Sequence, residues 1–176
     1  MFIAVDSFHK SDCLFIINRN KSIYPHSYPH MRIVIQRVER ASVKINDTIS
    51  GAINHGLLLL IGIHETDTKN EIDWCCRKIP KLRIFEDEEG KMNRSVQDVE
   101  GGLLVVSQFT LYGNAEKGNR PSFIEAAKPD KAEPLYDYIV DKLKKDSGVK
   151  VESGEFGAMM DVELVNSGPV TLILER

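Results

Sequence analysis

The chain has 176 residues, of which 42% are hydrophobic and 28% charged, and its formal net charge is −3 at pH 7. This length and composition predict a single globular domain and exclude a collagen-like, disordered or disulfide-dense chain. The longest strongly apolar run, residues 57–63, is far shorter than the ~20 residues that a membrane-spanning helix needs. We therefore expect no membrane partner.

The cysteines and the charge balance exclude further classes of protein. The three cysteines, Cys13, Cys75 and Cys76, are an odd count with one adjacent pair, which fits neither a disulfide framework nor metal-ligand spacing. A reducing compartment suits such a chain, so we expect a cytoplasmic protein. The balance of 23 basic and 26 acidic residues predicts that any nucleic-acid contact involves few phosphates.

The first thirty residues differ from the rest of the chain. They hold three of the five histidines and end in the turn-rich sequence Tyr-Pro-His-Ser-Tyr-Pro-His, after which Met31 opens a strand-like pattern. We expect residues 1–30 to be an N-terminal extension, poorly ordered or a wrongly assigned start, and residues 31–176 to be the functional domain.

The first half of this domain predicts three strands and a helix. The β-branched run 32–45 is followed by an Asn-Asp turn and a second strand over 48–53, and the uniformly apolar run 57–63 indicates a strand buried on both faces. Asp67 or Thr68 is the expected cap of a helix that runs to about residue 78, before Pro80.

The second half continues with strands and one more helix. A short strand over 83–85 precedes a charged turn, and an apolar strand covers 103–109. Asp130 and Glu133 have the spacing of a capping box at the start of a helix, and Gly148 suits its end. The last strands are expected over 149–151, 160–165 and 170–174. Seven or eight strands with two main helices predict an α+β fold, a single β-rich domain with a curved or barrel-like sheet.

Familiar catalytic motifs are absent. Residues 31–176 contain only His55 and His64, and they lack Gly-x-Ser-x-Gly, Walker loops, His-Glu-x-x-His and paired cysteine ligands. His64 as a general base is the minor alternative to a loop histidine with no role. We expect no metal and no cofactor, so any chemistry relies on main-chain groups, hydroxyls or the substrate itself.

Two polar segments stand out at the ends of apolar strands. The segment Ser107-Gln-Phe-Thr-Leu follows a buried run, and strand geometry predicts that Ser107 and Phe109 share one face and Gln108 and Thr110 the other. The segment Asn166-Ser-Gly-Pro is either a plain hairpin turn or a rigid bend that presents carbonyl oxygens as acceptors.

In combination these segments resemble the D-aminoacyl-tRNA deacylases, the family first described for D-tyrosyl-tRNA. The matching stretches occur in family order and span residues 31–176: Ile35-Gln-Arg-Val, Ala41-Ser-Val, Arg83-Ile-Phe, Lys91-Met-Asn, Leu104-Val-Val-Ser-Gln-Phe-Thr-Leu, Arg120-Pro-Ser-Phe, Leu135-Tyr-Asp-Tyr, Phe156 with Met160, and Val165-Asn-Ser-Gly-Pro-Val-Thr. Each motif alone is weak evidence for the family, whereas the whole set in this order is specific to it.

The resemblance implies a homodimer with two active sites at its interface. It implies hydrolysis of the ester that joins a D-amino acid to the terminal adenosine of tRNA, including glycyl-tRNA, as proofreading in trans. Gly168 and Pro169 match the family's Gly-cisPro motif, which reaches into the partner's pocket, and Arg37 matches the arginine that orients it. The remaining implied site residues are Ser107, Gln108, Phe109 and Thr110 of the pocket and oxyanion main chain, Phe156 and Met160 near the adenosine and substrate, and Asn166 and Thr171 in chiral selection.

Two questions have more than one answer at this point: which group promotes cleavage of the ester, and to which functional class the protein belongs. Either the 2′-hydroxyl of the substrate's terminal ribose helps to activate water, or Thr110 itself acts as the nucleophile. The rival classes are a non-catalytic nucleic-acid-binding β-domain that reuses the fold, and a hydrolase of other esters that uses Ser107 or Thr110.

Overall fold

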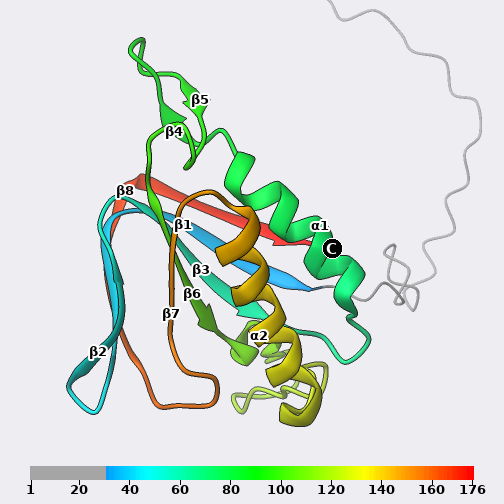
Figure 1. The fold of residues 1–176 in the computed structure, drawn as a ribbon. Coiled ribbons are helices and arrows are strands. Elements are labelled where there is room, and N and C mark those ends of the chain that lie inside the picture. The colour runs from blue at the N-terminus through cyan, green and yellow to red at the C-terminus, as the bar shows by residue number, and fades with distance from the viewer. Residues whose placement is uncertain (1–30) are drawn as a thin grey trace, which may run out of the picture.

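The computed structural model describes residues 31–176, and the expectation for residues 1–30 lies outside the described part. The sheet is organised around one long strand, β1 (Arg32–Ile45). β1 pairs antiparallel with β2 (Thr48–Ile53), β3 (Gly56–Gly62) and β8 (Asp161–Glu175) (Figure 1). Its first half pairs with β3 and its second half with β2, so the sheet bends along β1.

The sheet continues from β3 in the order β2-β1-β3-β6-β7, and β8 lies on β1 outside this path. β6 (Gly102–Ser107) and β7 (Lys150–Ser153) add in parallel. The two ends of the sheet, β2 and β7, approach each other, as shown by the hydrogen bond of 3.2 Å that Lys150 Nζ donates to the carbonyl of Ala52. The result is the nearly closed, barrel-like β-rich domain that the sequence predicts.

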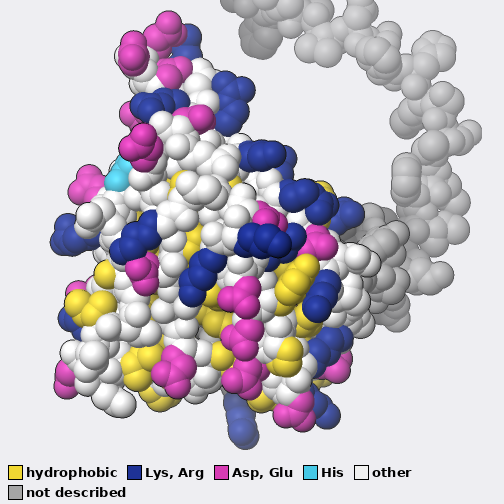
Figure 2. All heavy atoms as spheres, viewed as in Figure 1, with side chains coloured by type: hydrophobic (Ala, Val, Ile, Leu, Met, Phe, Trp, Pro, Cys, Tyr) yellow, Lys and Arg dark blue, Asp and Glu magenta, His cyan; other side chains and the backbone are white. Residues whose placement is uncertain are grey.

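Two helices cover one face of this sheet (Figure 1). α1 (Lys69–Lys78) begins at Thr68, which forms a complete capping box with Glu71, and continues into the 3₁₀ turn η1 (Ile79–Lys81). α2 (Pro129–Asp146) packs beside it, and both helices bury their apolar sides in the main core. Over these helices Lys and Arg alternate with Asp and Glu, without a large field of one sign (Figure 2).

The start of α2 differs from the prediction. Lys128 is the N-cap residue without a side-chain hydrogen bond, and Pro129 occupies the first turn, so the expected capping box of Asp130 and Glu133 is wrong. Proline suits the first helical position because its missing N–H has no acceptor there and its fixed φ is helical.

Three strand predictions need correction. β6 ends at Ser107; Gln108 N still donates to Ile61 O at 2.7 Å, and the chain then turns into the 3₁₀ helix η2 (Phe109–Tyr112). The two expected C-terminal strands are one strand, β8, with an irregularity in its pairing to β1. The short strand expected over 83–85 is β4 (Phe85–Glu86), and it forms a separate two-stranded sheet with β5 (Met92–Arg94), a strand that the sequence did not predict.

No helix within residues 31–176 is long and apolar enough to span a membrane.

Candidate active site

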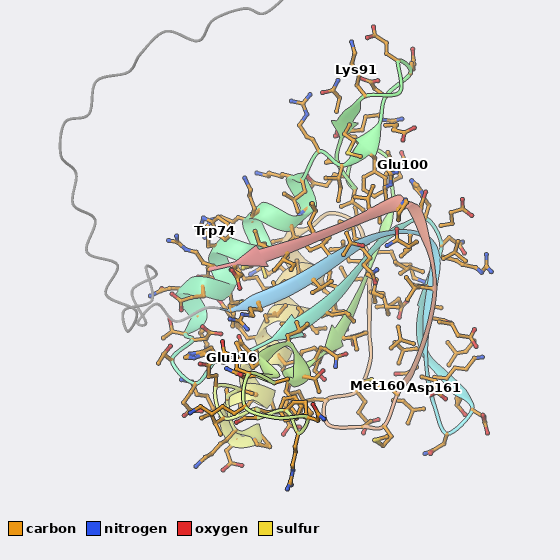
Figure 3. The ribbon with its side chains drawn as sticks, turned by 180° about the vertical axis from the view of Figure 1, so that it is seen from behind. Trp74, Lys91, Glu100, Glu116, Met160 and Asp161 are labelled. Carbon is orange, nitrogen blue, oxygen red and sulfur yellow. The ribbon has the colours of Figure 1, made fainter. Side chains whose placement is uncertain are left out.

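A largely apolar pocket of about 690 Å³ opens where β3 and β6 end, beside η2 and the start of α2. Six of the predicted site residues line it: Ser107, Gln108, Phe109, Thr110, Phe156 and Met160. Figure 3 places Met160 beside Asp161, the first residue of β8, and Met160 lines the pocket together with these strand ends. The structure therefore brings together two segments that lie about fifty residues apart in the chain.

η2 sets the geometry of the pocket rim. Because the chain leaves the sheet after Ser107, the expected alternation of side chains over residues 107–110 is wrong. The Phe109 side chain is 59% exposed, and its ring packs edge-on against Phe123 with 5.3 Å between centroids. Two aromatic rings thus stand at the pocket mouth, where a planar base can stack on them.

Tyr136 of α2 packs against Phe156, which lines the pocket. Its buried hydroxyl donates to Val105 O at 2.9 Å and lies 3.3 Å from Gly154 O, and burial raises the pKa of this phenol. The Phe156 ring lies 5.8 Å from the Tyr136 ring. A Cβ at Gly154 would lie 2.5 Å from Met160 Sδ, so only glycine lets Met160 occupy its place in the pocket.

The pocket has no acid–base machinery. Among the described residues, no titratable side chain lines it, and no cluster of His, Cys, Asp or Glu within residues 31–176 could hold a metal ion. His64 turns its ring towards Thr66, with 2.9 Å between Nδ1 and Oγ1. Burial in α1 raises the pKa of the Cys75 thiol to about 12, so this group stays protonated at neutral pH.

The polar groups that remain belong to Ser107 at the end of β6, to Gln108 and to η2. The side-chain amide of Gln108 donates to Thr110 Oγ1. The N–H groups of Phe109 and Thr110 begin the helix, where an N–H has no acceptor within the helix. Within the described part of the chain these two N–H groups make no main-chain hydrogen bond to another element. They are available as donors to a developing negative charge.

A second group of predicted residues surrounds a tight bend inside β8. The Gly168–Pro169 peptide bond is cis, and Gly168 has φ +119°. Asn166 closes the bend, since its Oδ1 accepts from Val170 N at 2.9 Å and its Nδ2 donates to Thr171 Oγ1 at 3.0 Å. Both halves of β8 pair with β1, so the alternative of a plain hairpin turn is wrong.

Arg37 of β1 packs against this bend and forms a hydrogen bond with its main chain. Its side chain is 5% exposed; Nε donates to Ser167 O at 3.1 Å and Nη1 to Ile84 O at 2.7 Å. An ion pair of 3.6 Å with Glu86 completes its surroundings. A Cβ at Gly168 would lie only 2.5 Å from Arg37 Nη2, so the guanidinium packs directly against the glycine.

The two groups do not meet within one chain. No residue of the bend lines the apolar pocket; Arg37 and Ser167 instead line a separate polar pocket of about 550 Å³ together with His55. Gly168 and Pro169 are exposed.

Sequence reasoning missed part of the apolar pocket wall. Ala126, Ala127 and Ala132 line it from the segment that leads into α2 and from the first turns of that helix. Small apolar residues carry no chemical signal in a sequence, and their role depends on where α2 starts. Phe123 was part of a recognised motif, but nothing in its spacing predicts the contact with Phe109.

The comparison with protein families decides the relationship. The model of the D-Tyr-tRNA(Tyr) deacylase family matches residues 34–175. The chain belongs to this family. The resemblance noted from the sequence is thereby confirmed, as is the expectation of a hydrolase.

Curated relatives of this deacylase family support the assignment. A D-aminoacyl-tRNA deacylase of Exiguobacterium sibiricum is 58% identical over 146 residues, which are 83% of this chain and 100% of the relative. One of Chloroherpeton thalassium is 57% identical over 145 residues, 82% of this chain and 95% of the relative.

Two solved structures share the fold. A c-Myc DNA unwinding element binding protein is 42% identical with a TM-score of 0.77, over 83% of this chain and 99% of that one. A probable eukaryotic D-amino acid tRNA deacylase has a TM-score of 0.74 over 84% of this chain and 100% of that one; at 19% identity it supports the fold alone.

Proposed function

We propose that this deacylase family member hydrolyses the ester of D-aminoacyl-tRNA, and of glycyl-tRNA, in the cytoplasm, as a proofreading enzyme acting in trans. The observation that carries the proposal is the uncharged pocket bounded by the free N–H groups of η2. An activated ester is a substrate that such a pocket can cleave, because it needs no strong base or metal.

The main chain supplies the catalytic interaction in this proposal. The N–H groups of Phe109 and Thr110 donate to the oxyanion that forms when water attacks the ester carbonyl. One such donor contributes about 3 kcal/mol of transition-state stabilisation. The vicinal 2′-hydroxyl of the terminal ribose assists the attacking water, since no described side chain in the pocket titrates.

The pocket mouth receives the terminal adenosine. Phe109 and Phe123 offer aromatic faces, and Phe156 and Met160 offer apolar surface beside them. Stacking of one base contributes ~1–3 kcal/mol without a charged contact. Recognition of the acceptor end alone therefore suits a chain whose net charge is −3.

A second copy of the chain completes the site. The bend of Gly168 and Pro169 projects from β8, which pairs only with β1 in the described sheet and leaves its outer edge open. Apolar side chains of β8 are exposed along this strand, among them Ile173 at 70%. An open strand edge with exposed apolar side chains favours association. In the homodimer that we propose, each bend enters the pocket of the other copy.

Chiral selection then follows from shape. Carbonyl oxygens of the bend hold the substrate's α-ammonium through charge-assisted hydrogen bonds. With the ammonium and the ester fixed, the side chain of a D-residue points out of the site, whereas that of an L-residue collides with the rigid backbone. Glycine has no side chain to exclude and is accepted.

One observation favours a second candidate. The 42% identical structural relative is named for binding a DNA element, which supports the alternative of a non-catalytic nucleic-acid-binding β-domain. Such a domain would bind nucleic acid and release no amino acid from charged tRNA. Release of D-tyrosine by the purified protein therefore separates the two.

Filling the apolar pocket tests where the reaction occurs. Ala126 lines the pocket, and its replacement by tryptophan should occlude the adenosine site. We expect Ala126→Trp to lower kcat/KM for release of D-tyrosine at least ~30-fold, about 2 kcal/mol of lost transition-state binding. Ile124→Trp is the matched control, because Ile124 is 89% exposed and lies outside the pocket lining. Equal activity of the two variants would place the reaction elsewhere.

A further inference from the structure

Asp67 is a buried carboxylate that lacks a partner for one oxygen. The residue is 1% exposed and lies in the turn before α1. Its Oδ2 accepts from His64 N at 2.6 Å, whereas Oδ1 is buried with no hydrogen bond. A buried charge without a full set of partners is strongly destabilising, so a partner for this oxygen would stabilise the fold.

The cations near Asp67 are engaged elsewhere. Lys131 Nζ donates to the carbonyl of Glu65, and the guanidinium of Arg176 lies over the Trp74 ring, 5.2 Å from its centroid. Neither forms an ion pair with Asp67 among the described residues. Glu71 is the nearby acid, and the Cys75 thiol and the Tyr112 phenol also face this carboxylate.

The main-chain nitrogen of Met31 is the remaining neighbour. The start of β1 and the C-terminal end of β8 lie side by side next to α1 (Figures 1 and 3). Met31 is fully buried, and its N–H is close enough to the Asp67 carboxylate to act on its pKa. In the 176-residue chain this nitrogen is an amide with a single hydrogen, which already donates to Arg176 O at 2.9 Å.

An α-ammonium at the same place has three N–H groups. One retains the hydrogen bond to Arg176 O, and the others can reach Asp67, so that the buried carboxylate gains both a hydrogen bond and a counter-charge. We propose that Asp67 is the binding site for the α-ammonium of a chain that begins at Met31, and that this form is the working enzyme. The start at Met31 is independent of the substrate assigned above.

One further observation supports this form. The whole length of the Exiguobacterium sibiricum relative is covered by a match of 146 residues, the length of residues 31–176. Burial raises the pKa of Asp67 to about 6 in the longer chain, so its ionisation opposes folding there.

The pH dependence has a defined sign. In the 176-residue chain, folding stability from Asp67 is present below the carboxyl's unfolded pKa of about 3.9 and is lost as the pH rises through about 6. In the chain that begins at Met31 the ammonium lowers the carboxyl pKa, so folding stability is no longer lost as the pH rises through about 6. The contribution of the Asp67–ammonium pair to folding stability declines only when the ammonium deprotonates, above its unfolded pKa of about 8.

The test is a mutational cycle at pH 7 with three N-termini. Asp67→Asn is introduced into the 176-residue chain, into the chain that begins at Met31, and into that shorter chain with Gly-Ser added before Met31. The added dipeptide keeps a free ammonium but moves it away from Asp67. Melting temperatures are measured for all six proteins, and the Asp67 carboxyl is titrated by NMR in the three parents.

We expect Asp67→Asn to lower the melting temperature by at least about 5 °C only in the chain that begins at Met31, and to leave it unchanged or raise it in the other two. The carboxyl should titrate below its ordinary value only in that same chain. Equal effects of Asp67→Asn in all three, or failure of the shorter chain to fold, would overturn the proposal. So would mass spectra of the native protein that contain peptides from residues 1–30. Loss of deacylase activity alone would bear on the proposed function and not on this site.

Discussion

Replacing Gly168 with alanine should abolish most of the activity on D-tyrosyl-tRNA. At φ +119° an L-residue is strained, by about 1–3 kcal/mol. The new methyl group would also lie 2.5 Å from Arg37 Nη2, and Arg37 is too buried and too well bonded to move freely. The bend must therefore shift, and with it the carbonyl oxygens that we propose to hold the substrate's ammonium. We expect kcat/KM for D-tyrosine release to fall at least ~100-fold.

A glycine that also has a positive φ, but with open space around it, provides the control. Gly90 has φ +74° in the turn between β4 and β5, and a Cβ there would meet nothing within 4 Å. Gly90→Ala should show the strain of the positive φ, as a lower melting temperature, with unchanged kinetics. If Gly168→Ala retained both the rate and the enantiomer preference of Gly90→Ala, the bend would have no part in selection.

Removal of the substrate's 2′-hydroxyl should have the second large effect. The apolar pocket contains no described side chain that can act as a base, and Thr110 Oγ1 accepts a hydrogen bond from Gln108 without a base beside it. We expect tRNA that ends in 2′-deoxyadenosine to be deacylated at least ~100-fold more slowly, whereas Thr110→Ala stays within ~5-fold of the parent.

The background reaction must be measured in parallel, because the hydroxyl also affects the uncatalysed hydrolysis. The relevant quantity is the enzymatic rate divided by the spontaneous rate for the same substrate. An unchanged ratio with the deoxy substrate would remove the ribose from the mechanism. Loss of activity in Thr110→Ala, with stability retained, would make Thr110 the nucleophile.

Periodicity predicted the sheet well because most of its strands are either buried on both faces or clearly alternating. β1 and β2 have the bounds that their β-branched runs predict, 32–45 and 48–53, and Thr68 caps α1 through a hydroxyl that is evident in the sequence. η2 could not be foreseen in the same way. Phe109 to Tyr112 have ordinary strand propensity, and nothing in their spacing shows that the chain leaves the sheet once Gln108 N has bonded to Ile61 O of the neighbouring strand.

The candidate site was predictable where residue types are chemically distinctive. Polar residues at the end of an apolar strand and conformationally special residues can be recognised in a sequence. This applies to the serine, glutamine and threonine of residues 107–110 and to the Gly168-Pro169 pair. The alanines that shape the pocket do not. Asp67 was read as an alternative helix cap, and its burial beside Met31 depends on how the first strand and the C-terminus meet.

The most direct measurement compares the release of D-tyrosine and L-tyrosine from the same charged tRNA by the unmodified protein. A rigid bend that selects by shape predicts rapid release of D-tyrosine and a rate for L-tyrosyl-tRNA indistinguishable from spontaneous hydrolysis, with glycyl-tRNA cleaved as well. Equal turnover of the two enantiomers would contradict the account, even if the apolar pocket proved to be the site of hydrolysis.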